Sequence, residues 1–310
     1  MERPNQTGVT NFLLVGFPSC QDLSLLLFSL ALPVFLLGLV GNLGLAVLIR
    51  AKRSLHTPMY YFLSHLALLD LCSCCAVGPV MLWGLLAGRA ALPGPACALQ
   101  MFLFAAATDA ECCLLAVMAY DRYAAICRPL HYQAAVPPRL CRALVLGSYA
   151  AGAASAAVHS SLAFCLPFCC SRAINSFFCD IPSVLELTCA DTSLSQALLL
   201  AICGAIQSFT LLAILASYRL ILGAVGQAGL RQAASTCGSH LAAVTVLYGT
   251  LIFMYLRPEG SYAPQADKMA AVLYTVVIPT LNPAIYSLRN ADVKGTLARW
   301  LLGGRRIWGG

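Results

Sequence analysis

Three acidic side chains interrupt long apolar stretches, and they are the first residues whose type and position could do chemistry. Asp70 lies in an apolar run over 59–86, and Asp109 and Glu111 lie in the next run, over 97–121. Ionisable groups at membrane depth are energetically unfavourable and commonly mark ion pathways or binding sites. A helix turns about 100° per residue, so Asp109 and Glu111 would point about 200° apart, toward different neighbours. Alternatively, each acid is protonated or hydrogen-bonded to Ser, Thr or Asn on an adjacent helix.

Two asparagines on other apolar runs extend this group. Asn42 and Asn282 could join Asp70 and Glu111 in one polar cluster at mid-depth. A proton or cation pathway would also use such groups, but transporters usually show internal repeats or paired broken helices, and this sequence shows none. It also lacks the Cys and His spacing of a zinc site and a G-x-S-x-G motif. We therefore expect no metal, no cofactor and no enzyme active site.

A second group of candidates lies where apolar runs end. Asp121, Arg122 and Tyr123 close the third run, and a basic segment that contains a proline follows. The motif "NPAIY" at 282–286 places Pro283 inside the last run, where proline removes one hydrogen bond and kinks a helix. Taken alone, the triplet fits an arginine that snorkels to the interface, and the proline fits a simple kink.

The elements that must position these residues are membrane-spanning helices. The 310 residues are 60% hydrophobic and 10% charged, whereas a soluble domain is about 25% charged. The expected fold class is all-α, a seven-transmembrane helix bundle over 23–289, with a tail over 1–22 and an inner segment over 290–310. A span needs about 20 apolar residues, and the candidates are roughly 23–49, 59–86, 97–121, 141–163, 195–222, 236–256 and 270–288.

The distribution of basic residues predicts the orientation of the bundle. Fourteen of the 19 Lys and Arg residues fall on one side of the predicted spans, where only Asp121 and Asp292 offset them. The side richer in Lys and Arg is cytoplasmic in most membrane proteins. We therefore expect the N-terminus outside, the C-terminus inside and the first span to act as an uncleaved signal anchor. The net charge of +7 is a topology signal, and no nucleic-acid partner is expected.

Two features lie outside the predicted spans. Asn5 begins the tripeptide "NQT", an acceptor pattern for glycosylation on the predicted outer tail. Val293, Leu297, Trp300 and Leu301 can share one helical face, which predicts a short amphipathic eighth helix on the inner leaflet.

The sixteen cysteines separate by depth. Most lie within the spans or on the inner side, and five candidates for disulfide bonding fall on the predicted outer, oxidising side. Those five can form at most two disulfides, and spacing alone leaves the connectivity open. They are Cys97, Cys169, Cys170, Cys179 and Cys189.

Six motifs in order resemble those of the odorant receptors, in the larger tetrapod-type class of this rhodopsin-like group of G-protein-coupled receptors. The resemblance covers nearly the whole chain. The motifs are "GN" at 41–42, "LHTPMYYFLSHLALLD" at 55–70, "MAYDRYAAICRPLHY" at 118–132, "SY" at 217–218, "STCGSH" at 235–240 and "PTLNPAIYSLRN" at 279–290.

The resemblance implies a receptor at the plasma membrane of olfactory cilia that binds small volatile, mostly apolar ligands. Its partners would be a stimulatory olfactory-type heterotrimeric G protein, which raises cyclic AMP, the membrane lipid and a trafficking chaperone. The resemblance also implies disulfides Cys97–Cys179 and Cys169–Cys189, and a polar core of Asn42, Asp70 and Glu111 that tunes the switch, with a cation as one option. The implied G-protein switch residues are Asp121, Arg122, Tyr123, Tyr218, Asn282, Pro283 and Tyr286.

The implied binding pocket lies in the outer half of the bundle. Asp109 departs from the family pattern, so we expect it to select ligands that carry an amine or another hydrogen-bond donor. Gln232 and Ala234 replace a usual Lys and Phe, which would weaken part of the G-protein contact. The positions that match family pocket residues are Phe104, Ala105, Thr108, Asp109, Ile202, Ile206, Tyr248, Leu251, Ile252, Tyr255 and Tyr274.

Overall fold

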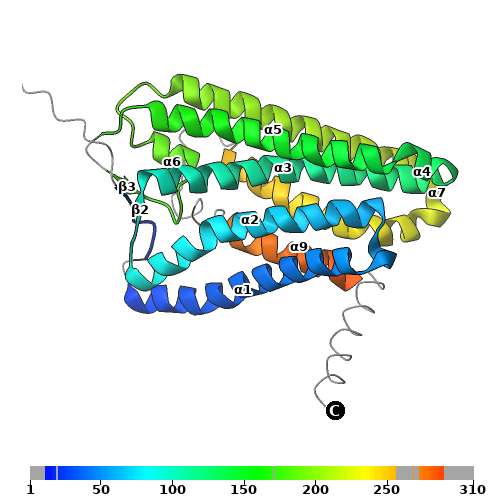
Figure 1. Cartoon of the computed structure of the whole chain (residues 1–310), viewed down its shortest axis with the longest axis horizontal. Helices are drawn as coiled ribbons and strands as arrows, with labels where there is room; N and C mark the ends of the chain where they lie inside the picture. The colour runs from blue at the N-terminus through cyan, green and yellow to red at the C-terminus, as the bar shows by residue number, and fades with distance from the viewer. Residues whose placement is uncertain (1–10, 19, 170–171, 256–267, 269–271, 290–310) are drawn as a thin grey trace, which may run out of the picture.

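The structure is a computed structural model that describes residues 11–18, 20–169, 172–255, 268 and 272–289, without the side chains of 225–236, 255, 274, 284 and 286–289. Long helices lie side by side along the longest axis of the molecule, and a small sheet covers one end of them (Figure 1). Within the described residues, six helical stretches are long and apolar enough to cross a membrane.

The first four predicted spans are single helices, each slightly longer than expected. Pro58 and Pro138 begin two of them, at the position where the missing N–H of proline needs no partner. Gly88, with φ 72°, ends one of them in the left-handed conformation that glycine adopts without strain. These helices are α1 (Gln21–Ala51), α2 (Pro58–Ala87), α3 (Gly94–Cys127) and α5 (Pro138–Cys165).

The fifth and sixth predicted spans lie in one helical element, α7 (Ser193–Tyr255), and not in two helices with a polar connector. A straight helix of that length would extend about 95 Å, but α7 turns back at the end of the bundle opposite the sheet (Figure 1). The Tyr218 hydroxyl lies 2.8 Å from His240 Nδ1, and the Thr210 hydroxyl lies 2.6 Å from the Tyr248 hydroxyl. From the first contact to the second, the chain position moves back by eight residues in one stretch and forward by eight in the other. The two apolar stretches of α7 therefore pack antiparallel.

The seventh predicted span, 270–288, is described from residue 272. It consists of a π-helical turn, η3 (Leu273–Val277), followed by α9 (Ile278–Arg289), which contains Pro283. A π-turn inside a helix is commonly found at functional sites. The predicted eighth helix and Asn5 lie outside the described residues.

A three-stranded sheet was not expected from the sequence, which indicated helices alone. Its central strand, β1 (Asn11–Leu14), is antiparallel to β2 (Ala90–Pro93) and parallel to β3 (Ala173–Ile174). Phe12 and Leu14 of β1 are 1% and 0% exposed. Part of the predicted outer tail is therefore packed against the bundle, because its two alternate apolar side chains enter the core.

Short helical turns connect the long helices. At the end of the bundle opposite the sheet lie η1 (Arg53–Leu55), η2 (Pro129–His131) and α4 (Tyr132–Ala135), while α6 (Ile181–Leu185) lies beside the sheet (Figure 1). Buried apolar side chains form two clusters, one along the bundle and one beneath the sheet. Leu37 and Val40 of α1 are 64% and 69% exposed, as expected for a helix face that contacts lipid.

Candidate functional site

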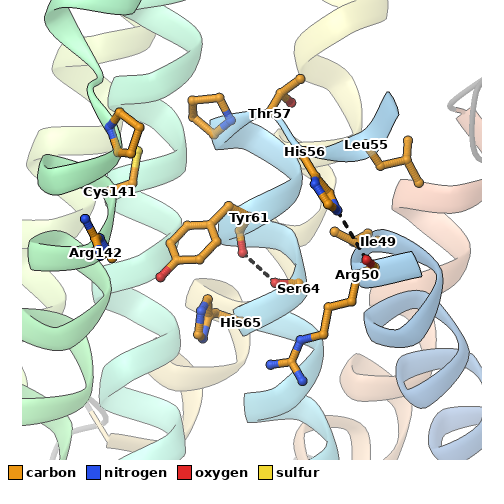
Figure 2. Close-up of a pocket in the computed structure, with 12 residues that line it drawn as sticks. Ile49, Arg50, Leu55, His56, Thr57, Tyr61, Ser64, His65, Cys141 and Arg142 are labelled. Carbon is orange, nitrogen blue, oxygen red and sulfur yellow. Dashed lines mark hydrogen bonds between the residues drawn. The ribbon is translucent and has the colours of Figure 1, made fainter. Parts of the chain in front are cut away.

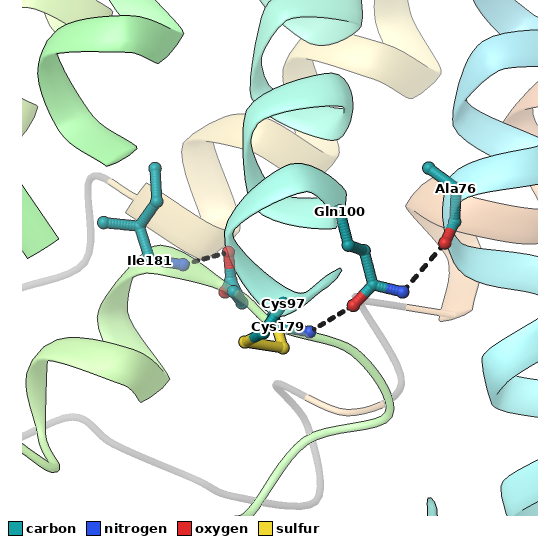
Figure 3. Close-up of a disulfide and its surroundings, with 6 residues drawn as sticks. Ala76, Cys97, Gln100, Cys179 and Ile181 are labelled. Carbon is teal, nitrogen blue, oxygen red and sulfur yellow. Dashed lines mark hydrogen bonds between the residues drawn. A yellow bond between two sulfur atoms is a disulfide. The ribbon is translucent and has the colours of Figure 1, made fainter. Parts of the chain in front are cut away.

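The loop between α5 and α7 is tied to the start of α3. A disulfide joins Cys97 to Cys179, and Gln100 lies one turn further along α3 (Figure 3). Gln100 Oε1 accepts a hydrogen bond from the Cys179 backbone N–H at 2.8 Å, and Gln100 Nε2 donates to the Ala76 carbonyl at 2.8 Å. Gln100 therefore links this loop to both α3 and α2. Sequence reasoning missed it, although a glutamine in an apolar run was a visible signal.

A second disulfide, Cys169–Cys189, lies within the same loop. The backbone N–H groups of the two cysteines donate across this turn, to the carbonyls of Leu187 and Pro167, each at 2.9 Å. Asp180 caps the short helix α6 by accepting from the Ile181 N–H at 2.9 Å. The loop thus forms a compact cover over the ends of α3 and α7 that lie beside the sheet, with the two cysteine pairings that the resemblance implied.

A small cavity of about 30 Å³ lies beneath this cover. Four of the eleven expected pocket residues line it, namely Phe104, Ala105, Thr108 and Asp109. The remaining lining residues come from the loop, from α3 and from the first half of α7: Met101, Cys179, Asp180, Ile181, Leu199, Cys203 and Gln207. Sites for small organic ligands are usually about 300–1,000 Å³, so a ligand can enter only if this cavity expands.

Five of the other expected pocket residues have described side chains, and none of these five lines the cavity. Ile202 and Ile206 are half-buried on α7. Tyr248 and Leu251 are buried in the bundle, whereas Ile252 is 45% exposed on the outside of its helix. Helical spacing explains the difference, since successive residues of one span face different neighbours. The side chains of Tyr255 and Tyr274 lie outside the described part of the chain.

Asp109 and Asp180 are the acidic residues in the described lining of this cavity, and Asp109 is the deeply buried one. Its side chain is 3% exposed, and Cys203 Sγ lies 4.0 Å from Asp109 Oδ2. The same sulfur lies 3.5 Å from His159 Nε2. These three side chains come from α3, α7 and α5 and place polar atoms where three spans meet. Among the described residues that line the cavity there is no Lys or Arg.

Three residues of the predicted polar cluster, Asp70, Glu111 and Asn282, are joined by hydrogen bonds, whereas Asn42 is not part of the cluster. Asn282 Nδ2 donates to Asp70 Oδ1 and Oδ2 at 3.2 and 3.1 Å, and to Glu111 Oε1 at 3.2 Å. All three side chains are at most 5% exposed. One amide thus joins two carboxyl groups from α2 and α3. Among the described residues, no group of three or more His, Cys, Asp or Glu is arranged to hold a metal ion.

Asn42 lies elsewhere, beside the proline-containing turn of α9. Pro283 has no N–H to donate to the carbonyl of Pro279, four residues earlier. Asn42 Nδ2 donates to that carbonyl oxygen at 2.7 Å. The neighbouring Gly41 allows close contact, because a Cβ there would lie 3.2 Å from Pro283 Cβ. The motifs "GN" and "NPAIY" therefore meet in space, and the asparagine replaces the donor that the proline lacks.

The Asp121–Arg122–Tyr123 triplet lies at the end of the bundle opposite the sheet. Asp121 is 2% exposed, and Asp121 Oδ1 accepts a hydrogen bond from the Tyr132 hydroxyl at 2.7 Å. Burial and this hydrogen bond raise the pKa of Tyr132, so its hydroxyl keeps its proton. Arg122 and Tyr123 are half-buried. Tyr132, the last residue of the third-span motif, was not among the expected switch residues.

A chain of hydrogen bonds joins α3 to both halves of α7. His240 Nε2 lies 3.0 Å from the Leu115 carbonyl, which can only accept, so Nε2 carries the proton. His240 Nδ1 then accepts from the Tyr218 hydroxyl at 2.8 Å. Sequence reasoning identified Tyr218 but not His240, although "STCGSH" contains it. The side chain of Tyr286, the last expected switch residue, lies outside the described part.

Comparison with known proteins gives one consistent assignment. The sequence profile of the olfactory receptor family matches residues 30–303. Human olfactory receptor 5C1 is 59% identical over 290 residues, which cover 92% of this chain and 91% of that receptor. Mouse olfactory receptor 5AR1 and human olfactory receptor 5W2 are 46% and 45% identical over 303 residues, covering 96% of this chain and 98% of each relative. Family membership implies a seven-span bundle without enzymatic activity. The chain therefore belongs to the olfactory receptor family and is a multi-pass, odorant-binding, G-protein-coupled receptor of the cell membrane.

Proposed function

We propose that this receptor binds small, mostly apolar odorants that carry an amine or another hydrogen-bond donor, in an expanded form of the cavity around Asp109. The observation that carries the proposal is the buried carboxyl group of Asp109 in a cavity whose described lining residues include no Lys or Arg. A donor on the ligand would satisfy that group, and the apolar wall formed by Met101, Phe104 and Leu199 would contact the rest of the molecule.

The size of the cavity links ligand binding to the receptor switch. About 30 Å³ is room for roughly one water molecule. An odorant must therefore stabilise an arrangement in which α3, α7 and the covering loop lie further apart. A ligand shifts an equilibrium only as far as it binds one state better than the other. Odorants that fill the expanded cavity would favour that state.

The opposite end of the bundle would face the cytoplasm and bind the G protein. This orientation is supported by the excess of Lys and Arg at that end. We expect Arg122 to contact a stimulatory olfactory-type G protein and so raise cyclic AMP. Tyr132 would restrain the neighbouring Asp121 in the arrangement described above. We also expect Asn5 to be glycosylated and a trafficking chaperone to assist delivery of the receptor to the cell surface.

Cyclic AMP in cells is the test. Cells would carry the chain, a trafficking chaperone and the olfactory G protein, and would be exposed to volatile amines, alcohols and isosteric hydrocarbons. A dose-dependent response that Arg122→Ala abolishes at equal surface level would support receptor coupling. Silence of the parent chain toward every donor-bearing compound, despite surface expression, would count against the proposed ligand class.

Asp109→Asn tests the ligand contact. Loss of a charged hydrogen bond corresponds to about 1.5–3 kcal/mol, so the amine potency should fall roughly tenfold to a hundredfold, while hydrocarbon responses stay unchanged. Asp22→Asn is the matched control, because Asp22 is an exposed acid in the first turn of α1. Unchanged amine potency in Asp109→Asn would contradict the proposed contact between Asp109 and the ligand.

A further inference from the structure

A larger cavity, unrelated to the Asp109 site, lies at the opposite end of the bundle between α1, α2 and α5 (Figure 2). Its volume is about 400 Å³, within the range of small-molecule sites. Its wall is mainly apolar and includes Ile49 and Leu55, which are 4% and 0% exposed. Nothing in the receptor mechanism described above uses this space.

The described lining of the cavity carries two arginines and no acidic side chain. Arg50 of α1 and Arg142 of α5 enter from opposite sides, with Tyr61 and His65 of α2 between them (Figure 2). Both arginines are exposed. No Asp or Glu is among the described residues that line the cavity. Within that part of the chain, the two guanidinium groups therefore have no carboxylate beside them in the cavity.

Backbone geometry adds to this positive potential. Pro58 and Pro138, the first residues of α2 and α5, both line the cavity. The N-terminal end of a helix carries a partial positive charge of about half a unit, which favours anions. Two polar side chains of the lining are already engaged locally: Ser64 Oγ donates to the Tyr61 carbonyl at 2.7 Å, and His56 Nε2 lies 3.2 Å from the Arg50 carbonyl (Figure 2).

We propose that this cavity binds an anionic phospholipid, with its phosphate between Arg50 and Arg142 and an acyl chain against the apolar wall. A lipid fits better than a soluble anion, because the site combines two cations with a mainly apolar surface at the end of membrane-spanning helices. Basic pockets between helices near the inner surface of a membrane favour anionic headgroups. The bound lipid would connect α1 to α5 across α2. The assignment to the cytoplasmic leaflet rests on the proposed orientation.

Lipid titration followed by native mass spectrometry tests the proposal. The purified full-length receptor in neutral detergent is titrated with dioleoyl phosphatidylserine, and separately with dioleoyl phosphatidylcholine. We expect each arginine to contribute roughly fivefold to the apparent Kd, so Arg50→Gln with Arg142→Gln should weaken phosphatidylserine binding about thirtyfold. The matched control is Arg53→Gln with Arg139→Gln, which removes two exposed arginines from the same region that do not line the cavity. The control should bind within about twofold of the parent.

Four outcomes would overturn the proposal. Equal phosphatidylserine binding by the parent and the Arg50/Arg142 variant would show that these two arginines do not bind the headgroup. An equal loss of binding in the control would show that any arginine of this region has the same effect. Equal binding of phosphatidylcholine would indicate a neutral apolar occupant. Full competition by soluble glycerophosphoserine at the same concentration would indicate an anion site without an acyl-chain contact. None of these measurements requires an odorant or a G protein, so they are independent of the proposed receptor mechanism.

Discussion

Substitution of Gly152 by alanine is expected to push α5 away from α3 directly beside Asp109. A Cβ at position 152 would lie 2.3 Å from the Ala106 carbonyl oxygen and 2.9 Å from the Ala110 backbone nitrogen. Ordinary non-bonded contacts lie near 3.5 Å, so the helices would have to separate by about 1 Å. The obstructing atoms are backbone atoms, which cannot rotate away as a flexible side chain could.

The size of the effect follows from two opposing contributions. Overpacking a close contact costs about 1–3 kcal/mol, while alanine is about 1 kcal/mol more favourable than glycine in a helix. Gly152→Ala should therefore destabilise the receptor by about 0–2 kcal/mol. Gly147, on the same helix, has no atom within 4 Å of its Cβ position. Gly147→Ala should therefore show only the favourable helix propensity of alanine, and it serves as the matched control.

Thermal unfolding followed with a thiol-reactive dye measures the difference in stability between the two variants. Cys74, Cys112 and Cys237 are buried and become reactive on unfolding. The two variants should differ by roughly 2 kcal/mol, or a few degrees in Tm, with Gly147→Ala at or above the parent. Odorant potency should fall in Gly152→Ala alone, because Asp109 moves with α3. A Tm of Gly152→Ala equal to or above that of Gly147→Ala would refute the close approach.

Two further predictions concern hydrogen bonds between helices. Asn42→Leu should destabilise the receptor by about 1–3 kcal/mol, because the Pro279 carbonyl, 2.7 Å from Asn42 Nδ2, loses its donor at the kink; an unchanged Tm in the thiol-dye assay would contradict this. Tyr218→Phe should raise basal cyclic AMP roughly twofold to tenfold, since one neutral hydrogen bond, worth about 0.5–1.5 kcal/mol, would no longer hold the second half of α7 through His240. Basal signalling equal to that of the parent at equal surface level would show that this bond does not restrain the switch.

Local sequence patterns were enough to locate most of the helices and the family. An apolar stretch of about 20 residues has few alternatives to a helix in a membrane, because every backbone group must bond within its own segment. The starts of α2 and α5 were within three residues of those expected, and Pro58 and Pro138 lie there at the first helical position, which proline favours. The short motifs identified the odorant receptors without any structural information.

The small sheet and the continuity of α7 were not predictable in this way. β1 is four residues long, and its partners lie far away in the chain, so no periodic pattern distinguishes it from an irregular tail. The segment between the two halves of α7 contains polar residues, which indicated a loop, yet the helix continues through it. Local composition is a weak guide where tertiary contacts decide the conformation.

The sequence by itself determined which residues could do chemistry in this receptor: the buried acids, the arginine of the third-span motif and the cysteines on the predicted outer side. Only the tertiary structure decided which of them meet. It assigned Asn282 to Asp70 and Glu111, Asn42 to the kink at Pro283, and Tyr132 to Asp121. It also brought together two arginines separated by more than ninety residues around one cavity. The physical reason is that a partner on another helix depends on helix rotation and packing, which the spacing along one helix does not contain.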